Sequence, residues 1–371
     1  MRVYLIAGEA SGDLHGSNLV KALKTLHPAC SFRGLGGDLM QSAGVDIVRH
    51  YREMAFMGFS EVIQNLKTIM AMMKECRRDI AAYKPDVVVL IDYPGFNLRM
   101  AGYTHKAGIP TVYYISPQVW AWKKSRIRQI RQDVDLMLTI LPFEKSFYHK
   151  HGYSAEWVGH PLLDVIHNYQ PVALTEILPG NHPGGKPLIA LLPGSRRQEI
   201  KTMLPIMARM PAFFPDYDFV IAAAPSMDED FINQHTAGEK IPIIKGHTYD
   251  ILAHARAALV TSGTASLETA LWEVPQVICY KGSALSYHIA RWLVDIPFIG
   301  LPNLVMDKPL VKELIQYDFN ATNLREELSR LLTDNVYSCR MREEYRMLKE
   351  KLGGRGASEN AARKILGLLN Q

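Results

Sequence analysis

The 371-residue sequence has little cysteine and no long apolar run. Its four cysteines, Cys30, Cys76, Cys279 and Cys339, are widely spaced, so they suggest neither a CxxC metal site nor a disulfide framework. No apolar run approaches the length of a membrane span, and the run Val3 to Ala7 is too short for a signal-peptide core. We therefore expect a cytoplasmic protein whose membrane contact is peripheral.

Several motifs that would assign a particular chemistry are also missing. The sequence has no P-loop with Lys-Ser or Lys-Thr, no GxGxxG fingerprint, no GxSxG nucleophile elbow and no HExxH arrangement among its 13 histidines. The DxD-type pairs precede predicted strands or begin a helix, where capping explains them better than magnesium does. We therefore expect no metal and no cofactor. The net charge of +5 is too mild for a general nucleic-acid binder, and we expect no nucleic-acid partner.

Strand-like and helix-like segments alternate twice along the chain. Strands are predicted first at residues 2–7, 31–35, 86–91, 111–115, 136–141 and 155–158, then at 187–192, 218–223, 242–244, 257–261 and 276–280. Helices are predicted between them, for example at residues 18–26 and 61–83. This alternation predicts two parallel-sheet α/β domains, with the Pro- and Gly-rich residues 168–187 as the linker and charged helices from residue 323 onward.

Asp92 follows the most apolar strand in the sequence. Residues 86–91 are rich in β-branched side chains without polar alternation, which predicts a central parallel strand covered on both faces. In open α/β sheets the ligand crevice lies beyond the carboxyl ends of the strands. We therefore predict that Asp92 lies in such a crevice and acts as a general base.

Glycine-rich or polar segments follow several other predicted strands. They are residues 8–13, 34–38, 116–122, 193–197 and 262–268. A single cleft between the two sheets would bring all of them together. Ser11, Ser116, Ser195 and Ser262 lie in these segments, and we interpret them as phosphate or hydroxyl ligands rather than nucleophiles.

Two of these segments, both in the second half, have the pattern of an anion site. Each precedes a predicted helix, so free backbone N–H groups and a positive dipole end should face a diphosphate. Arg196 and Arg197 would add charge-assisted bonds to the phosphate oxygens, and Glu268, one turn into its helix, would accept hydrogen bonds from ribose hydroxyls. Ordinary N-caps explain either loop alone equally well, but two in one half favour a nucleotide. The residues concerned are Gly194, Ser195, Arg196, Ser262, Gly263, Thr264 and Glu268.

Two stretches combine basic and apolar side chains. Residues 120–131 hold two tryptophans and a run of lysines and arginines without an acid, and the helix after Ser60 has apolar residues at helical spacing. A solvated face and an amphipathic core helix are the simplest interpretations. Anionic lipid, a phosphorylated sugar or single-stranded nucleic acid are the alternatives for the first stretch, and a lipid-touching face is the alternative for the second.

Eight motifs, in order, resemble those of the bacterial lipid-A-disaccharide synthase family. They are GEASGD at residues 8–13, IDYPGFN at 91–97, SPQVWAW at 116–122, LPFE at 141–144, VGHP at 158–161, LPGSR at 192–196, SGTA at 262–265 and LPNL at 301–304. The resemblance implies a GT-B-like fold, with two Rossmann-like domains facing a central cleft. It also implies an inverting glycosyltransferase that condenses UDP-2,3-diacylglucosamine with 2,3-diacylglucosamine 1-phosphate. The products are UDP and the β(1→6)-linked lipid A disaccharide 1-phosphate.

The same resemblance implies roles for individual residues. Asp92 falls on the family's proposed catalytic carboxylate. The first domain would bind the lipid acceptor, and we assign to that side Glu9, Ser11, Gly12, Asp13, Gly37, Asn97, Ser116, Gln118 and Trp120. The second domain would bind UDP through the residues of the anion site, and Asn303 of the LPNL motif joins them.

Domain limits and assembly are expected from the same reasoning. We expect an N-terminal acceptor domain at residues 1–167, a UDP-sugar domain at 168–345 and a helical segment at 346–371 that packs on the N-terminal domain or on a partner subunit. A homodimer and a peripheral position on the inner membrane are expected.

Other functions remain open at this stage. Another GT-B sugar-nucleotide enzyme, either a transferase with a soluble acceptor or a UDP-sugar epimerase, would share the fold and the nucleotide loops. A dinucleotide oxidoreductase would need a glycine fingerprint, and the spacing of Gly8 and Gly12 does not match it. A membrane-surface RNA-binding protein would leave Asp92 without a role.

Overall fold

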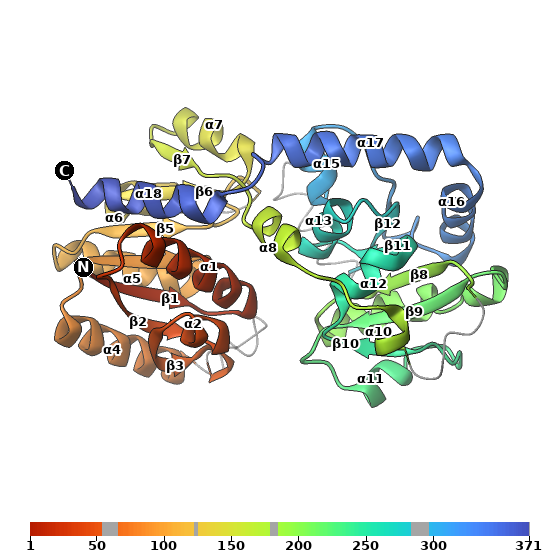
Figure 1. The fold of residues 1–371 in the computed structure, drawn as a ribbon, viewed down its shortest axis with the longest axis horizontal. Helices are drawn as coiled ribbons and strands as arrows, with labels where there is room; N and C mark the ends of the chain where they lie inside the picture. The colour runs from red at the N-terminus through yellow and green to blue at the C-terminus, as the bar shows by residue number, and fades with distance from the viewer. Residues whose placement is uncertain (54–65, 122–124, 179–184, 283–296, 371) are drawn as a thin grey trace. The chain divides into compact units, whose positions relative to one another are not determined.

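A computed structural model describes residues 1–53, 66–121, 125–178, 185–282 and 297–370 (Figure 1). The chain divides into two compact units, the first comprising Met1–Asp164 with Leu352–Gln371 and the second Val165–Lys351. Each unit contains one sheet, of seven strands in the first and six in the second, and every strand pair described is parallel. This confirms the predicted α/β fold with two parallel-sheet domains.

The sheet of the first unit has the strand order β3-β2-β1-β4-β5-β6-β7. Its strands are β1 (Arg2–Ala7), β2 (Ser31–Gly36), β3 (Val45–His50), β4 (Val87–Ile91), β5 (Thr111–Tyr114), β6 (Leu136–Thr139) and β7 (Ala155–Trp157). The helices are α1 (Ala10–Leu26), α2 (Asp38–Ser42), η1 (Tyr51–Glu53), α4 (Leu66–Tyr83), α5 (Pro94–Lys106), α6 (Arg126–Asp133), α7 (Pro142–Lys150) and α18 (Ala357–Leu369). Helix α8 (Leu162–Asn168) spans the point where the chain leaves this unit.

Strand β4 lies at the centre of this sheet, and all its side chains are buried. Val88 and Leu90 pack into one apolar core together with residues of α4 and α5. Val87, Val89 and Ile91 pack into a second core, on the other face, with residues of α1 and α18. Burial of each such side chain stabilises the fold by about 1.5–3 kcal/mol, so the continuous apolar run of β4 fixes both the strand's position and its two-sided cover.

The sheet of the second unit has the order β10-β9-β8-β11-β12-β13. Its strands are β8 (Leu188–Leu192), β9 (Asp218–Ala223), β10 (Ile243–Lys245), β11 (Ala255–Thr261), β12 (Gln276–Tyr280) and β13 (Glu313–Ile315). The helices are α9 (Leu174–Ile177), α10 (Arg197–Met207), η2 (Pro211–Phe213), α11 (Glu229–Asn233), α12 (Thr248–His254), α13 (Thr264–Leu271), α15 (Leu301–Met306), α16 (Ala321–Thr333) and α17 (Asn335–Lys351). In the described residues no helix is both long and apolar enough to cross a membrane.

Three elements differ from the sequence-based prediction. The edge strands β3 and β13 were not predicted, because β3 carries charged residues and β13 has only three residues. Helix α1 begins at Ala10, although its predicted start was residue 18. Glycines at its beginning suggested a loop, but they are needed for packing, since an added Cβ at Gly12 would lie 3.2 Å from the Ala7 Cβ and one at Gly16 would lie 2.7 Å from the Met40 Sδ. The predicted helix at residues 61–83 begins outside the described residues, and α4 is described from Leu66.

The C-terminal helix α18 belongs to the first unit. Its residues Ala361, Ala362 and Ile365 are buried in the core that also contains Leu19 and Leu23 of α1, and Figure 1 shows α18 lying beside α1. The Asp164 carboxylate accepts hydrogen bonds from the backbone N–H groups of Gly356 at 2.7 Å and Ser358 at 3.1 Å, which satisfies two donors at the start of α18.

Replacing Asp164 should loosen this helix selectively. Asp164→Ala leaves the Gly356 and Ser358 N–H groups without an acceptor, and we expect a loss of about 1–2 kcal/mol in the local stability of α18. Amide hydrogen exchange should show faster exchange in α18, with a smaller effect for Asp164→Asn, which keeps one acceptor oxygen. Unchanged exchange in the alanine variant would contradict the capping role.

Candidate active site

Asp92 lies directly after β4 in a turn of unusual backbone geometry. Both Asp92 and Tyr93 adopt left-handed conformations, with φ of 46° and 48°. Such conformations cost on the order of 1–3 kcal/mol each in residues other than glycine, and they persist where the surroundings hold them. The Asp92 N–H donates to the carbonyl oxygen of Tyr114 at 3.0 Å, so the turn is also tied to the neighbouring strand β5.

Two buried side chains hold the carbonyl of Asp92. The Tyr113 hydroxyl donates to it at 2.6 Å, and the Asn97 amide donates at 2.7 Å. The same Asn97 amide lies 3.1 Å from the Ile91 carbonyl and 3.3 Å from the Ile6 carbonyl. Asn97 is fully buried, so in this structure it supports the Asp92 turn from within the unit.

The electrostatics of Asp92 suit proton transfer near neutral pH. Burial, with a smaller contribution from the negative charge of Glu9, raises the pKa of Asp92 to about 7, although a hydrogen bond from the Tyr93 backbone N–H acts in the opposite direction. Glu9 is exposed at the N-cap of α1, which follows the neighbouring strand β1. A general base works best when its pKa lies near the operating pH.

Most other residues at the exits of β1 and β2 have structural contacts. The Asp13 carboxylate is buried and accepts from the N–H groups of Gly37 at 2.8 Å, Leu39 at 3.1 Å and Met40 at 3.0 Å. These bonds satisfy the first donors of α2 and fix the Gly37 turn. Ser11 is exposed in the first turn of α1, and Gly12 is buried beneath it.

The segment Ser116–Trp120, hereafter the 116–120 loop, follows β5. Ser116 and Trp120 are buried, and Gln118 between them is exposed. The Ser116 hydroxyl lies 2.7 Å from the Tyr148 hydroxyl, and the Trp120 indole N–H donates to Glu144 Oε1 at 3.1 Å. Gln118 is therefore the predicted residue of this loop whose side chain faces solvent. Trp122, Lys123 and Lys124 of the predicted basic stretch lie outside the described residues.

In the second unit, the loop before α10 departs from the prediction of free N–H groups. Glu199 Oε2 accepts from the backbone N–H of Ser195 at 3.0 Å and of Arg196 at 3.2 Å. The prediction was wrong here because Glu199 is the third residue of α10, where a glutamate can fold back onto the N-cap. The Arg196 side chain is 67 % exposed and only 3.5 Å from Glu199 Oε1, so it remains accessible to a ligand. Gly194 precedes it with a φ of 110°.

The loop before α13 fits the prediction better. The N-cap residue of α13 is Gly263, and no described side chain caps this helix end. Gly263 and Thr264 are exposed, while the Ser262 hydroxyl donates to the Ile299 carbonyl at 3.0 Å. Of the two loops predicted to bind an anion, the one before α13 therefore has the helix N-terminus that is open to it.

Glu268 and Asn303 are both engaged by neighbouring groups. The Tyr249 hydroxyl donates to Glu268 Oε1 at 2.6 Å, and burial raises the pKa of Glu268 while this bond lowers it. Asn303 is buried, its amide donates to the Val311 carbonyl and to Glu313 Oε1, both at 2.8 Å, and its oxygen accepts from the Val311 N–H. Asn303 thus links α15 to the chain leading into β13.

Sequence reasoning missed Glu144, Glu199 and Tyr249 as parts of these sites. The two glutamates stand at the third position of a helix, a pattern of helix starts that the sequence does show. Tyr249 has no such local pattern, because its contact with Glu268 depends on the packing of α12 against α13.

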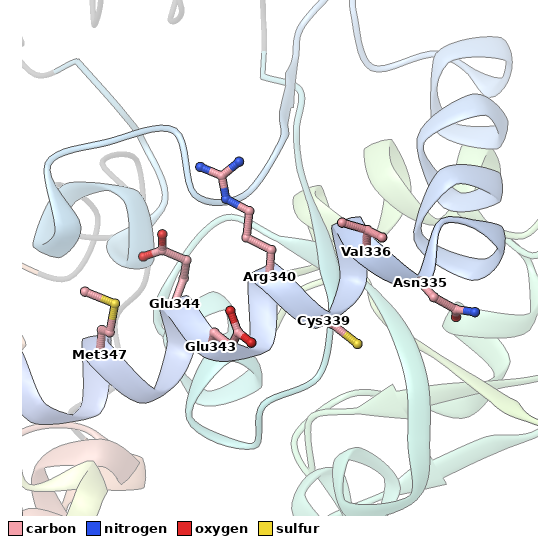
Figure 2. Close-up of a pocket in the computed structure, with 7 residues that line it drawn as sticks. All are labelled: Asn335, Val336, Cys339, Arg340, Glu343, Glu344 and Met347. Atoms are coloured by element: carbon pink, nitrogen blue, oxygen red, sulfur yellow. The ribbon is translucent and has the colours of Figure 1, made fainter.

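A cavity of about 580 Å³ lies elsewhere, along α17 (Figure 2). Its lining residues are Asn335, Val336, Cys339, Arg340, Glu343, Glu344 and Met347, all on that one helix. None of the predicted site residues lies there, so we do not assign it to the candidate site. In the part of the chain that the structure describes, no group of three metal-ligating side chains comes together.

Comparisons with known proteins show the family and the fold of this chain. The family model described as lipid-A-disaccharide synthetase matches residues 3–365. The lipid-A-disaccharide synthase of Syntrophus aciditrophicus is 41% identical over 376 residues, covering 100% of this chain and 98% of the relative. The structure of UDP-GlcNAc 2-epimerase from Neisseria meningitidis bound to UDP-GlcNAc has a TM-score of 0.71 at 11% identity and covers both chains fully. That of the calicheamicin glycosyltransferase CalG4 has a TM-score of 0.60 at 16% identity, with 100% and 98% coverage.

Because the pKa of Asp92 is raised in the folded protein, a substitution that removes its charge should stabilise the protein, and the gain should depend on pH. A carboxyl whose pKa is raised in the folded state favours folding below the unfolded pKa, and this contribution is lost as the pH rises through about 7. Asp92→Asn removes this partly buried charge, so its free energy of unfolding at pH 8 should exceed that of the unmodified protein by about 2 kcal/mol.

Urea unfolding at pH 8 and pH 4 would measure the difference, which should shrink at the lower pH. Asp216→Asn removes an exposed carboxylate and serves as the matched control for charge alone. An equal stability difference at both pH values would contradict the assigned pKa.

Proposed function

Since this chain belongs to the lipid-A-disaccharide synthase family of lipid A biosynthesis glycosyltransferases, we propose the reaction it catalyses and the residues that perform it. The reaction joins UDP-2,3-diacylglucosamine to 2,3-diacylglucosamine 1-phosphate, giving the β(1→6)-linked lipid A disaccharide 1-phosphate and UDP. The observation that carries this proposal is the full-length family match in a chain with a partly buried carboxylate at the end of the central strand.

The second unit binds UDP in this proposal. The uncapped N-terminus of α13 at Gly263 and Thr264 offers backbone donors and a positive dipole end to the diphosphate. Arg196 is exposed on the neighbouring loop and supplies a charged donor. Glu268 has one oxygen bonded by Tyr249, and its other oxygen accepts from the ribose.

Asp92 acts as the general base on the acceptor. An α-linked donor that gives a β product requires attack on C1 from the face opposite UDP. As the acceptor 6-hydroxyl oxygen bonds to C1, its proton passes to the Asp92 carboxylate and the bond from C1 to the UDP oxygen breaks. A pKa of about 7 lets this carboxylate take a proton near neutral pH.

The departing diphosphate gains negative charge as the glycosidic bond breaks. Preorganised donors stabilise such developing charge with little reorganisation, because they point at the oxygen before the reaction starts. Here the α13 N-terminus and Arg196 fill that role. The absence of a metal requirement remains a prediction, which an assay with EDTA tests.

The lipid substrates place the enzyme at a membrane surface. We propose peripheral association with the cytoplasmic face of the inner membrane through the first unit. Leu39 and Met70 of that unit are 46 % and 63 % exposed, and Arg77 and Arg78 lie on the same helix as Met70. The expected homodimer stays a prediction.

Asp92→Asn should abolish turnover and preserve nucleotide binding. General bases contribute roughly 10²–10⁴-fold to rate, so kcat should fall by at least about 100-fold. Calorimetric UDP affinity should stay within about twofold, because Asp92 lies outside the UDP unit. In the unmodified protein kcat/KM should rise with pH through about 7, and Glu9→Gln should move that rise to lower pH. Near-normal turnover of Asp92→Asn would exclude the base role.

Arg196→Ala should weaken both UDP binding and rate. Loss of one charge-assisted bond to a phosphate corresponds to a roughly tenfold rise in the Kd for UDP. Arg197→Ala is the matched control, because the Arg197 guanidinium lies 4.5 Å over the Phe231 ring. Equal UDP affinity of the two variants would remove Arg196 from the site.

A further inference from the structure

Glu144 is a fully buried carboxylate that the proposed chemistry does not use. It is 1 % exposed, and its Oε2 accepts from the backbone N–H groups of Ile140 at 3.2 Å and Leu141 at 2.9 Å. These two bonds cap the start of α7, as a glutamate at the third helical position often does. Capping uses only Oε2 of Glu144, so Oε1 can accept a hydrogen bond from another part of the chain.

The second oxygen holds the 116–120 loop. Glu144 Oε1 accepts the indole N–H of Trp120 at 3.1 Å, a bond between groups that are both buried. The Trp120 ring also packs edge-on against Phe143, the residue before Glu144, with ring centroids 5.0 Å apart. At the other end of the loop, the Ser116 hydroxyl lies 2.7 Å from the Tyr148 hydroxyl of the same helix. Helix α7 therefore holds both ends of the loop and leaves Gln118 exposed between them.

The loop is connected to the Asp92 turn through one strand. Tyr113 and Tyr114 end β5, and only Ile115 separates them from the loop. Both bond the Asp92 backbone, Tyr113 through its hydroxyl and Tyr114 through its carbonyl. A shift of the loop would therefore move the end of β5 and, through these bonds, the backbone of Asp92, the predicted base. A displacement of this kind is costly for catalysis, since reacting groups must be held within a fraction of an ångström.

We propose that Glu144 is a positioning residue that acts through Trp120 to hold the 116–120 loop in the shape that binds the lipid acceptor. This proposal rests on the proposed function, which places the acceptor on the first unit. Glu144 itself is too deeply buried to touch a substrate, so its influence on acceptor binding passes through the loop.

Glu144→Gln separates the loop contact from the helix cap. The glutamine carbonyl oxygen can still accept from the Leu141 N–H, but the amide nitrogen then faces the Trp120 indole N–H, and two donors cannot bond. Trp120→Phe removes the indole donor while keeping a ring against Phe143. Glu144→Gln thus removes the acceptor of this hydrogen bond, and Trp120→Phe removes its donor.

The test is a double-mutant cycle on acceptor binding. Equilibrium binding of 2,3-diacylglucosamine 1-phosphate in detergent should weaken about tenfold in Glu144→Gln and in Trp120→Phe. The double variant should weaken by the same factor as each single variant, because a second change removes nothing further. The KM for the acceptor should follow the Kd, while the Kd for UDP stays constant.

Asn320→Ala is the matched control for a simple loss of stability. Asn320 caps α16 of the second unit by accepting from the Asn323 N–H, so its removal weakens a helix start far from the loop in sequence and should leave acceptor binding unchanged. If Glu144→Gln does not fold, Trp120→Phe alone tests the bond.

Unchanged acceptor binding in Trp120→Phe, or losses that add in the double variant, would overturn the positioning role. A protein that binds the acceptor with this coupling but transfers no sugar would overturn the proposed function and leave the role of Glu144 standing. An unmodified protein that does not bind the acceptor would overturn both.

Discussion

The position of the candidate active site depends on where the buried strand β4 ends. Strand β4 is apolar on both faces, so it must run through the middle of its unit, and the first polar side chain after it, Asp92, lies partly buried at the carboxyl end of the sheet. Asn97 and Tyr113 bond the backbone of this turn and hold it in a left-handed conformation. Partial burial then raises the pKa of the carboxyl toward neutrality. The position of Asp92, the left-handed backbone of its turn and the raised pKa of its carboxyl therefore all follow from the burial of β4 and its neighbours.

Carboxylates elsewhere in the chain have a different task. Asp13, Glu144, Asp164 and Glu199 each accept from two or more backbone N–H groups at the beginning of a helix. These bonds fix the loops at the sheet edges, which otherwise would carry unsatisfied donors. Asp92 and the exposed Arg196 are not committed in this way, which is one reason why we propose them for the chemistry.

The sequence alone predicted the two parallel sheets, the central position of β4, and the family, because apolar runs and ordered motifs are local signals. It did not predict the edge strands β3 and β13, which gain little from burial, or the early start of α1, whose glycines serve close packing. It also did not reveal the partners within the chain of Asn97, Asp13 and Asn303, which it assigned as ligand contacts. Such partners depend on tertiary contacts that spacing does not reveal.

The proposed reaction transfers a sugar from a UDP-sugar to the 6-hydroxyl of a phosphorylated lipid acceptor. The most direct test measures UDP release from UDP-2,3-diacylglucosamine by the purified protein in detergent, with EDTA, with and without 2,3-diacylglucosamine 1-phosphate. The proposed reaction predicts release only when the lipid phosphate is added, together with a disaccharide product. Absence of release with both substrates, or release of UDP without a disaccharide, would contradict it.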